Sequence, residues 1–311
     1  MELITVADGV HAVLQEGARL GESNSGLIAS GGGLVVDTFW DLPSTQQLLD
    51  LYASVHPDMP GRLVNTHHNG DHCFGNQLVT GAEIIAHRGC AERFGTDAPP
   101  ELLASLATAD DLPAHLAAFA EALRAFDFAG IELTPPTTII DGDTTIDLGD
   151  RAVELLYVGP AHTEGDVAVW LEDDGVLFTG DVLFHRCAPI GWEGSFATWI
   201  EALERLAALE PAVVVPGHGP LTDVGGLLDL RDYLVYVRAE ARTHFDAGLD
   251  VYTAATKIDL APFPGWSEHE RIVFQVDRAY REFRGEPWDA PFDAIRLLGD
   301  VGRLRAVLEQ S

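Results

Sequence analysis

The chain has 311 residues, 47% of them apolar, which is enough to bury a large core and too apolar for a disordered chain. Its 19 basic and 49 acidic residues give a formal net charge of −30, a field that repels phosphate backbones and anionic lipid heads. The composition therefore excludes a collagen-like or low-complexity protein and argues against nucleic acid or a membrane surface as a partner.

The first 15 residues have neither a basic region nor a long apolar run, so we expect no secretory signal. The longest uncharged stretch, 23–36, contains four glycines and is too short to span a bilayer. Three cysteines, Cys73, Cys90 and Cys187, are too few for a disulfide framework. These features predict a cytoplasmic protein with free thiols.

Short strands dominate the first 90 residues. The segment 4–14 breaks at an Asp-Gly turn signal, and the runs 25–30 and 33–38, separated by glycines, predict a hairpin. Residues 42–55 have helical spacing of leucines. The runs 62–66 and 83–86 predict further strands, the first of them buried.

Residues 99–128 are rich in Ala and Leu and are broken by Pro113, so we expect a helical insertion. Strand runs punctuated by turn signals follow at 137–149, 152–159, 166–173 and 175–181. Residues 197–209 predict an amphipathic helix, and 212–219 predict a strand that ends in a glycine-rich loop. The chain after 221 is mostly helical, most clearly at 231–244 and 269–284.

This order of elements fits two sheets covered by helices on both outer faces, an α/β architecture. No linker-like stretch divides the chain. We therefore expect one main domain over 1–225, with its helical insertion at about 98–128. A helical C-terminal extension over 226–311 is expected to pack on the same domain.

Four loops combine histidine or aspartate with glycine, and each follows a predicted strand. They read THHNGDH at 66–72, GPAHTEGD at 159–166, TGD at 179–181 and PGHG at 216–219. Imidazole and carboxylate are ligands that zinc, iron and manganese accept, and adjacent strand ends bring them together on rigid elements. One such histidine would be an ordinary surface residue, but four loops of this kind indicate a metal centre.

The four motifs, in this order from about residue 5 to 220, resemble the metallo-β-lactamase superfamily. The resemblance implies an αββα four-layer sandwich with two metal sites. The family pattern H-x-H-x-D-H stands here as His67-x-Asn69-x-Asp71-His72. By this analogy the first site takes His67, Asn69 and His162, the second takes Asp71, His72 and His218, and Asp181 bridges the two.

Asn69 occupies a position where the family has histidine. An amide oxygen is a neutral and weak zinc ligand, so the first site keeps two imidazoles and the shared carboxylate. Three occupancies stay open: two Zn²⁺ ions with a weak first site, one ion in the second site, or one ion with a loosely held second. Iron or manganese could replace zinc, and Asn69 could instead hydrogen-bond a substrate.

The ligand set predicts a hydrolase that uses a metal-bound hydroxide on an acyl substrate. A bound metal lowers the pKa of water from about 15.7 toward about 7 and polarises a carbonyl. Asp71 could orient the nucleophile and take its proton, which makes it a candidate catalytic residue. Thioesters, lactones and lactams are open to this chemistry, whereas the net charge of −30 disfavours phosphodiesters.

The residues around the motifs narrow the resemblance. The runs NGDHCFGN at 69–76, SNSGLI at 23–28 and DVLFH at 181–185 resemble an actinobacterial branch of the superfamily. That branch includes the cyclase/thioesterase proteins of aromatic (type II) polyketide pathways in antibiotic biosynthesis. The resemblance implies a small-molecule acyl substrate, either free or presented on an acyl carrier protein.

His185 and Cys187 closely follow the predicted bridging aspartate and should border the metal cavity. We take His185 as a candidate catalytic donor to a developing oxyanion, with a plain wall residue as the alternative for both. Trp192, Phe196 and Trp199 form either core or the floor of a pocket for a flat apolar substrate. The helical insertion could be a lid over that pocket.

Three other functions remain open. They are a lactone or lactam hydrolase, an iron-dependent oxidoreductase of the same fold, and a metal-binding protein without catalysis. The sequence offers no flavodoxin-like or rubredoxin-like module, which disfavours the oxidoreductase. The Gly31-Gly32-Gly33 run lacks the helix that should follow a phosphate-binding loop, so no nucleotide site is expected.

Overall fold

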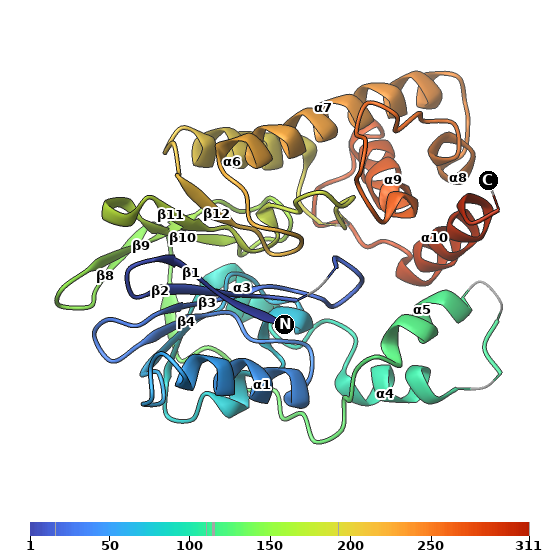
Figure 1. Ribbon diagram of the computed structural model, residues 1–311. Helices are drawn as coiled ribbons and strands as arrows, with labels where there is room; N and C mark the ends of the chain where they lie inside the picture. Colours follow the sequence, from blue (N-terminus) through green and yellow to red (C-terminus); the bar gives the residue numbers. More distant parts are fainter. Residues whose placement is uncertain (16, 110, 114–115, 192, 311) are drawn as a thin grey trace.

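The computed structural model describes the chain except residues 16, 110, 114–115, 192 and 311. Two sheets lie face to face, and helices cover both outer faces (Figure 1). The strand order is β1-β2-β3-β4-β5-β6-β7 in the first sheet and β12-β11-β10-β9-β8 in the second. The expected αββα sandwich with helical additions is therefore confirmed.

The first sheet begins as an antiparallel meander and continues as parallel strands. Its strands are β1 Glu2–Ala7, β2 Val10–Leu14, β3 Ser25–Ile28, β4 Leu34–Val36, β5 Arg62–Val64, β6 Glu83–His87 and β7 Thr138–Ile140. Strands β1 to β4 pair antiparallel, including the predicted β3–β4 hairpin, and β4 to β7 pair parallel. The parallel step from β4 to β5 needs a crossover, which α1 Leu42–Ala53 supplies.

The second sheet consists of β8 Thr144–Asp147, β9 Ala152–Tyr157, β10 Val167–Leu171, β11 Val176–Phe178 and β12 Val213–Val215. Strands β8 to β11 pair antiparallel, and β12 joins β11 in parallel after the crossover helix α6 Phe196–Ala207. Apolar side chains from the inner faces of both sheets, among them Ile28, Val64 and Phe178, form one buried cluster. This cluster fixes the two sheets against each other.

The outer layer of the second sheet continues into the C-terminal helices. These elements are α7 Val224–Asp246, α8 Val251–Ala255, the 3-10 turn η5 His269–Arg271, α9 Ile272–Phe283 and α10 Ala294–Leu308. One buried cluster joins them to α6 and β10. The predicted boundary at 225/226 falls in the first turn of α7, so the extension is continuous with the sandwich. The division into 1–225 and 226–311 stays a prediction.

The helical insertion forms α4 Pro100–Thr108 and α5 Ala117–Leu123. Helix α5 contacts α10, so two segments far apart in sequence meet at one end of the sandwich (Figure 1). The remaining short elements are α2 Gly70–Cys73, η1 Asn76–Leu78, α3 Arg88–Arg93, η3 Glu172–Asp174 and η4 Gly180–Val182. No helix among the described residues is both long and apolar enough to cross a bilayer.

Candidate metal centre

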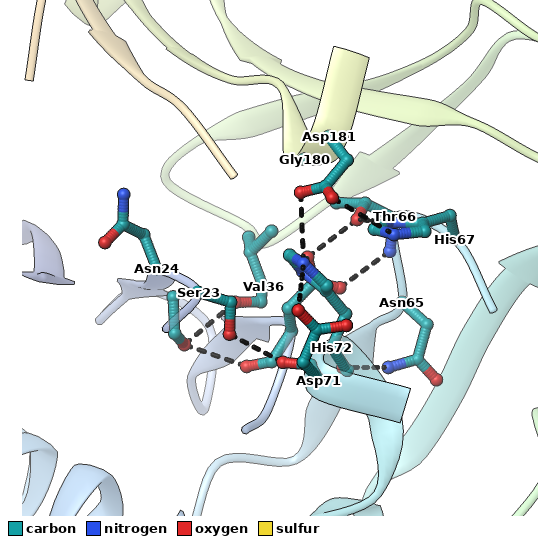
Figure 2. A network of polar contacts seen from close by, with 12 residues as sticks. Ser23, Asn24, Val36, Asn65, Thr66, His67, Asp71, His72, Gly180 and Asp181 are labelled. Carbon is teal, nitrogen blue, oxygen red and sulfur yellow. Dashed lines mark hydrogen bonds and ion pairs between the residues drawn. The ribbon is translucent and has the colours of Figure 1, made fainter. Parts of the chain in front are cut away.

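The predicted ligand residues come from loops that follow strands of both sheets. His67 follows β5, His162 follows β9, Asp181 lies in η4 after β11, and His218 follows β12. Figure 2 shows Asp181 reaching from the second sheet toward His67 and His72, which belong to the first. The site therefore lies between the two sheets, and each sheet contributes part of the ligand set.

Two glycines let the loops come this close. A side chain at Gly180 would collide with Thr66, and a side chain at Gly217 would collide with the carboxylate of Asp181. Gly180 also has a φ of 50°, a backbone conformation that favours glycine. The glycines beside the ligands thus serve the close approach of loops.

Hydrogen bonds hold the short helix α2, which carries Asp71 and His72. The Ser23 hydroxyl donates to the backbone oxygen of Asp71 at 2.6 Å. The backbone oxygen of His72 accepts from the Thr38 amide at 2.9 Å and from the Asn65 side chain at 3.3 Å. Both side chains therefore start from a fixed backbone (Figure 2).

The carboxylate of Asp181 lies at the middle of the cluster. Its oxygens are 3.1 Å from His72 Nε2, 3.2 Å from His218 Nε2, 3.5 Å from His162 Nε2 and 3.9 Å from His67 Nε2. Asp71 Oδ2 lies 3.4 Å from His218 Nε2. Ligand atoms around a tetrahedral ion are about 3.3 Å apart when each is about 2.0–2.1 Å from the metal, so these spacings suit a metal centre.

Each of the four histidines is anchored through its outer ring nitrogen. The Nδ1 atom of His67 lies 3.0 Å from Thr66 Oγ1, and that of His72 lies 2.9 Å from Asp37 Oδ2. The Nδ1 atoms of His162 and His218 each lie 2.9 Å from a backbone oxygen, that of Ile190 and that of Glu22, respectively. Three of these partners can only accept, and Thr66 uses its own proton to donate to Asp37 at 2.6 Å. Every Nδ1 therefore donates, and in the neutral ring every Nε2 presents its lone pair to the centre.

Three of the inward atoms have no hydrogen-bond partner among the described residues, although they are buried. They are His67 Nε2, His72 Nε2 and Asp181 Oδ1. Buried polar atoms without partners are costly in a folded protein unless a ligand satisfies them. Three groups of residues place ligand atoms within 4.8 Å of one another: His67, His162 and Asp181; Asp71, His72 and His218; and Asp37, His67 and His72. Asp37 receives the Nδ1 proton of His72 behind the rings, so the first two groups are the ones that match the two predicted sites. The residues present therefore fit two metal ions.

The electrostatics of the cluster follow from its burial and its two carboxylates. Burial and the neighbouring His72 lower the pKa of His67 well below its ordinary value. Burial lowers the pKa of His162 against the opposing charge of Asp181. Burial would also lower the pKa of His218, but Asp181 overrides it and raises that pKa to about 9. The carboxylates thus attract positive charge to the space between the rings.

Asn69 completes the set, and the structure brings all seven predicted ligand residues together. Its Oδ1 lies 2.8 Å from His162 Nε2 on the side of the first group. The individual roles of these residues as ligands stay a prediction.

Asp37 is the site residue that sequence reasoning missed. It accepts from the backbone amide of Thr66 at 2.7 Å and from its hydroxyl, and it receives the Nδ1 proton of His72. The available signal was an aspartate directly after β4, the strand parallel to the one that precedes His67. Parallel neighbours place their carboxyl ends at the same edge of a sheet.

A cavity of about 460 Å³ opens above the ligand atoms. Its floor carries Asn69, Asp71, His162, Asp181 and His218. Its apolar walls include Trp40, Phe74, Leu103 and Phe119, together with Phe274, Phe292, Leu298 and Val301 from the C-terminal segment. Leu103 and Phe119 belong to the helical insertion, so the segment expected as a lid forms one wall of the cavity.

The other predicted pocket residues lie elsewhere. Phe184 lines the cavity, whereas the adjacent His185 is not among the lining residues and its Nδ1 lies 2.9 Å from the Pro220 oxygen. Successive side chains of an extended segment face opposite sides, which separates these two. The catalytic role of His185 stays a prediction, without a contact in the cavity to support it. Cys187 is fully buried in the core.

Of the three aromatic residues predicted near the site, Trp192 lies outside the described residues. Phe196 and Trp199 belong to the hydrophobic core, which was one of the two alternatives. The Trp199 indole donates to the Val182 oxygen at 2.9 Å. Other aromatic side chains, named above, supply the apolar walls.

Fold and site together define a metal-binding αββα protein, and comparison with known proteins agrees. Residues 18–218 match the family model of the Metallo-beta-lactamase superfamily. The chain therefore belongs to the metallo-beta-lactamase superfamily.

Three proteins similar to this chain differ in the activities that their names describe. The chain is 32% identical over 152 residues to a hydroxyacylglutathione hydrolase from Methylococcus capsulatus, covering 48% of this chain and 44% of that protein. It is 28% identical over 221 residues to the alpha subunit of a 2,4-dinitroanisole O-demethylase from a Nocardioides species, covering 69% and 54%. The chain thus spans about half the length of these curated relatives. A solved sec-alkylsulfatase from a Pseudomonas species shares the fold with a TM-score of 0.69 at 16% identity, over 99% of this chain and 56% of that one.

Proposed function

We propose that the chain is a metal-dependent hydrolase of acyl substrates with a bulky apolar body, foremost a thioesterase or cyclase acting on a polyketide-type thioester. The observation that carries this proposal is the position of the metal-ligand cluster at the floor of an apolar-walled cavity. Hydrolysis needs the metal-ligand cluster, and selection of a bulky acyl group needs the apolar walls.

The chain would hold one ion with His67, Asn69, His162 and Asp181, and the other with Asp71, His72, His218 and Asp181. A bound metal would lower the pKa of water and supply a positive charge that polarises the substrate carbonyl. Asp71 is the candidate proton acceptor. Its carboxylate faces the cavity from the fixed helix α2, with Oδ2 3.4 Å from His218 Nε2. In that position it can orient a water molecule and accept its proton.

The residues of the cavity walls favour a substrate with an uncharged acyl body. Among the described lining residues, the three arginines are already paired with glutamates. Arg93 Nε lies 3.2 Å from Glu164, Arg271 Nη2 lies 3.1 Å from Glu268, and Arg305 Nη2 lies 2.9 Å from the same Glu268. An acidic substrate would have to compete with these ion pairs, whereas an apolar one needs only the aromatic and aliphatic surface. The relative named for hydroxyacylglutathione, an acyl compound, adds support for acyl hydrolysis.

The proposal is tested by elemental analysis of the purified protein together with a panel of substrates. The panel contains a large aromatic thioester on a small thiol and on an acyl carrier protein, an acetyl thioester, a lactone, a lactam and an aryl methyl ether. We expect bound zinc and a kcat/KM that is highest for the large thioester. Faster turnover of the lactam or lactone would move the protein to those activities, and bound iron with oxygen consumption would replace hydrolysis by redox chemistry.

A further inference from the structure

Asn69 is held from the side opposite to the metal centre. Its amide nitrogen Nδ2 lies 2.9 Å from Asp97 Oδ2, and its oxygen Oδ1 lies 2.8 Å from His162 Nε2. The contact between Asn69 and His162 is buried, whereas the contact with Asp97 is partly buried because the Asp97 side chain is 31% exposed. Asp97 lies just before the helical insertion and lines the same cavity.

The chemistry of Asp97 determines which way the Asn69 amide faces. An ionised carboxylate has no proton and can only accept, so it selects the NH₂ end of the amide. The carbonyl oxygen of Asn69 must then face the metal centre. Without Asp97 the amide could rotate by half a turn and present its NH₂ group, which cannot bind a cation.

The partner of the Asn69 oxygen also indicates that this end is arranged for a positive charge. The Nδ1 proton of His162 is committed to the Ile190 oxygen at 2.9 Å, so in the neutral ring Nε2 carries a lone pair. Two lone pairs, on Nε2 and on Asn69 Oδ1, therefore face each other at 2.8 Å. Such a contact is repulsive unless positive charge lies between the atoms, either as a cation beside both or as a second ring proton on Nε2.

We propose that Asp97 is a positioning residue for the first metal site: by binding the amide NH₂ of Asn69, it turns the amide oxygen into a metal ligand. This inference rests on the metal centre of the proposed function but not on its substrate. It gives the first site two imidazole nitrogens, one neutral oxygen and the shared Asp181 carboxylate. The second site has the same number of imidazoles and an additional carboxylate, from Asp71.

The test measures metal binding without turnover. Equilibrium dialysis against Zn²⁺, followed by elemental analysis, gives the affinities of the tight and the weak site in each variant. We expect Asp97→Ala to weaken the weak site by about 10–100-fold, the usual effect of removing a residue that orients a ligand, and to leave the tight site unchanged. Asp97→Asn should stay within about threefold of the unmodified protein, because its own amide oxygen can still accept from Asn69.

Two further variants distinguish a positioning role of Asp97 from a general effect of its negative charge on metal binding. Asp97→Ala in an Asn69→Ala background should have no additional effect, since Asp97 acts through Asn69. Glu193→Gln is the matched control because it removes another carboxylate of the same cavity that is not bonded to Asn69. Circular dichroism verifies that each variant is folded.

The outcomes are decisive in both directions. The inference is overturned if Asp97→Ala leaves both affinities unchanged, or if it weakens binding equally without Asn69. It is also overturned if Asp97→Asn and Glu193→Gln lose as much affinity as Asp97→Ala, which would indicate a general charge effect. If the unmodified protein binds no metal, the proposed function fails first and the inference fails with it.

Discussion

At the residue scale, the four imidazoles of the centre depend on the acceptors behind them. Asp37 shows this most clearly, because it receives the Nδ1 proton of His72 at 2.9 Å and also two hydrogen bonds from Thr66. The acceptor fixes the ring tautomer, and the tautomer decides whether Nε2 has a lone pair for a metal.

Asp37→Asn should therefore weaken the tight metal site by about 10–100-fold while the fold persists. The new NH₂ group would face His72 Nδ1 and favour the opposite tautomer, with the proton on Nε2. Asparagine tolerates the φ of 61° at this position, so the backbone need not change. Competition with a chromophoric chelator measures the affinity. An unchanged affinity would show that Asp37 serves the loop alone.

At the element scale, the sequence predicted most strands and helices because their periodicity is local. The β3–β4 hairpin and the helix of residues 42–55, observed as α1, are examples. The seven predicted ligand residues, which the structure brings together, came from family motifs at strand ends. The sequence did not predict features that depend on register or on packing between distant segments. The neighbouring residues Phe184 and His185 face different sides, and the helix α10 and its contact with α5 join segments far apart in sequence.

The loop after β9 also depends on one carboxylate. Asp166 accepts from the amide of Thr163 at 2.8 Å, from its hydroxyl at 2.7 Å and from the amide of Ala161 at 3.3 Å. These bonds close the loop around His162. Asp166→Ala should cost about 1–3 kcal/mol, since it leaves buried donors without that partner, and it should lower the metal content.

The matched variant Asp166→Asn should keep most of the stability, because its oxygen still accepts from both amides and the Thr163 hydroxyl can turn to accept. Urea denaturation midpoints and elemental analysis compare the two variants. Equal midpoints and metal contents in Asp166→Ala and the unmodified protein would refute the role of this loop.

At the scale of the whole molecule, different parts of the chain form the floor and the walls of the cavity. The floor belongs to the sandwich, whereas much of the walls belongs to the insertion and the C-terminal helices. The walls should therefore control which substrate binds, and the floor should control the chemistry. Phe119 on α5 and Val301 on α10 both line the cavity and offer a test.

Phe119→Ala should raise KM for a large aromatic thioester about fivefold and leave KM for an acetyl thioester nearly unchanged. The estimate assumes that roughly 40 Å² of apolar contact is lost at about 25 cal/mol per Å². Val301→Ala should act in the same direction but more weakly. The control is Val235→Ala on α7, at a half-exposed residue outside the cavity lining. An equal rise for both substrates would reassign Phe119 to packing of the insertion.

The anchor of His218 has a consequence for the time course of biosynthesis. Its Nδ1 is bonded to the oxygen of Glu22, a residue 196 positions earlier in the chain. At about 5–20 residues per second, the ribosome adds His218 about 10–40 s after Glu22. In the later part of that interval the nascent chain carries His67, Asp71 and His72 but does not yet contain His218. Both ends of the predicted ligand set must therefore have been synthesised before the complete centre can form.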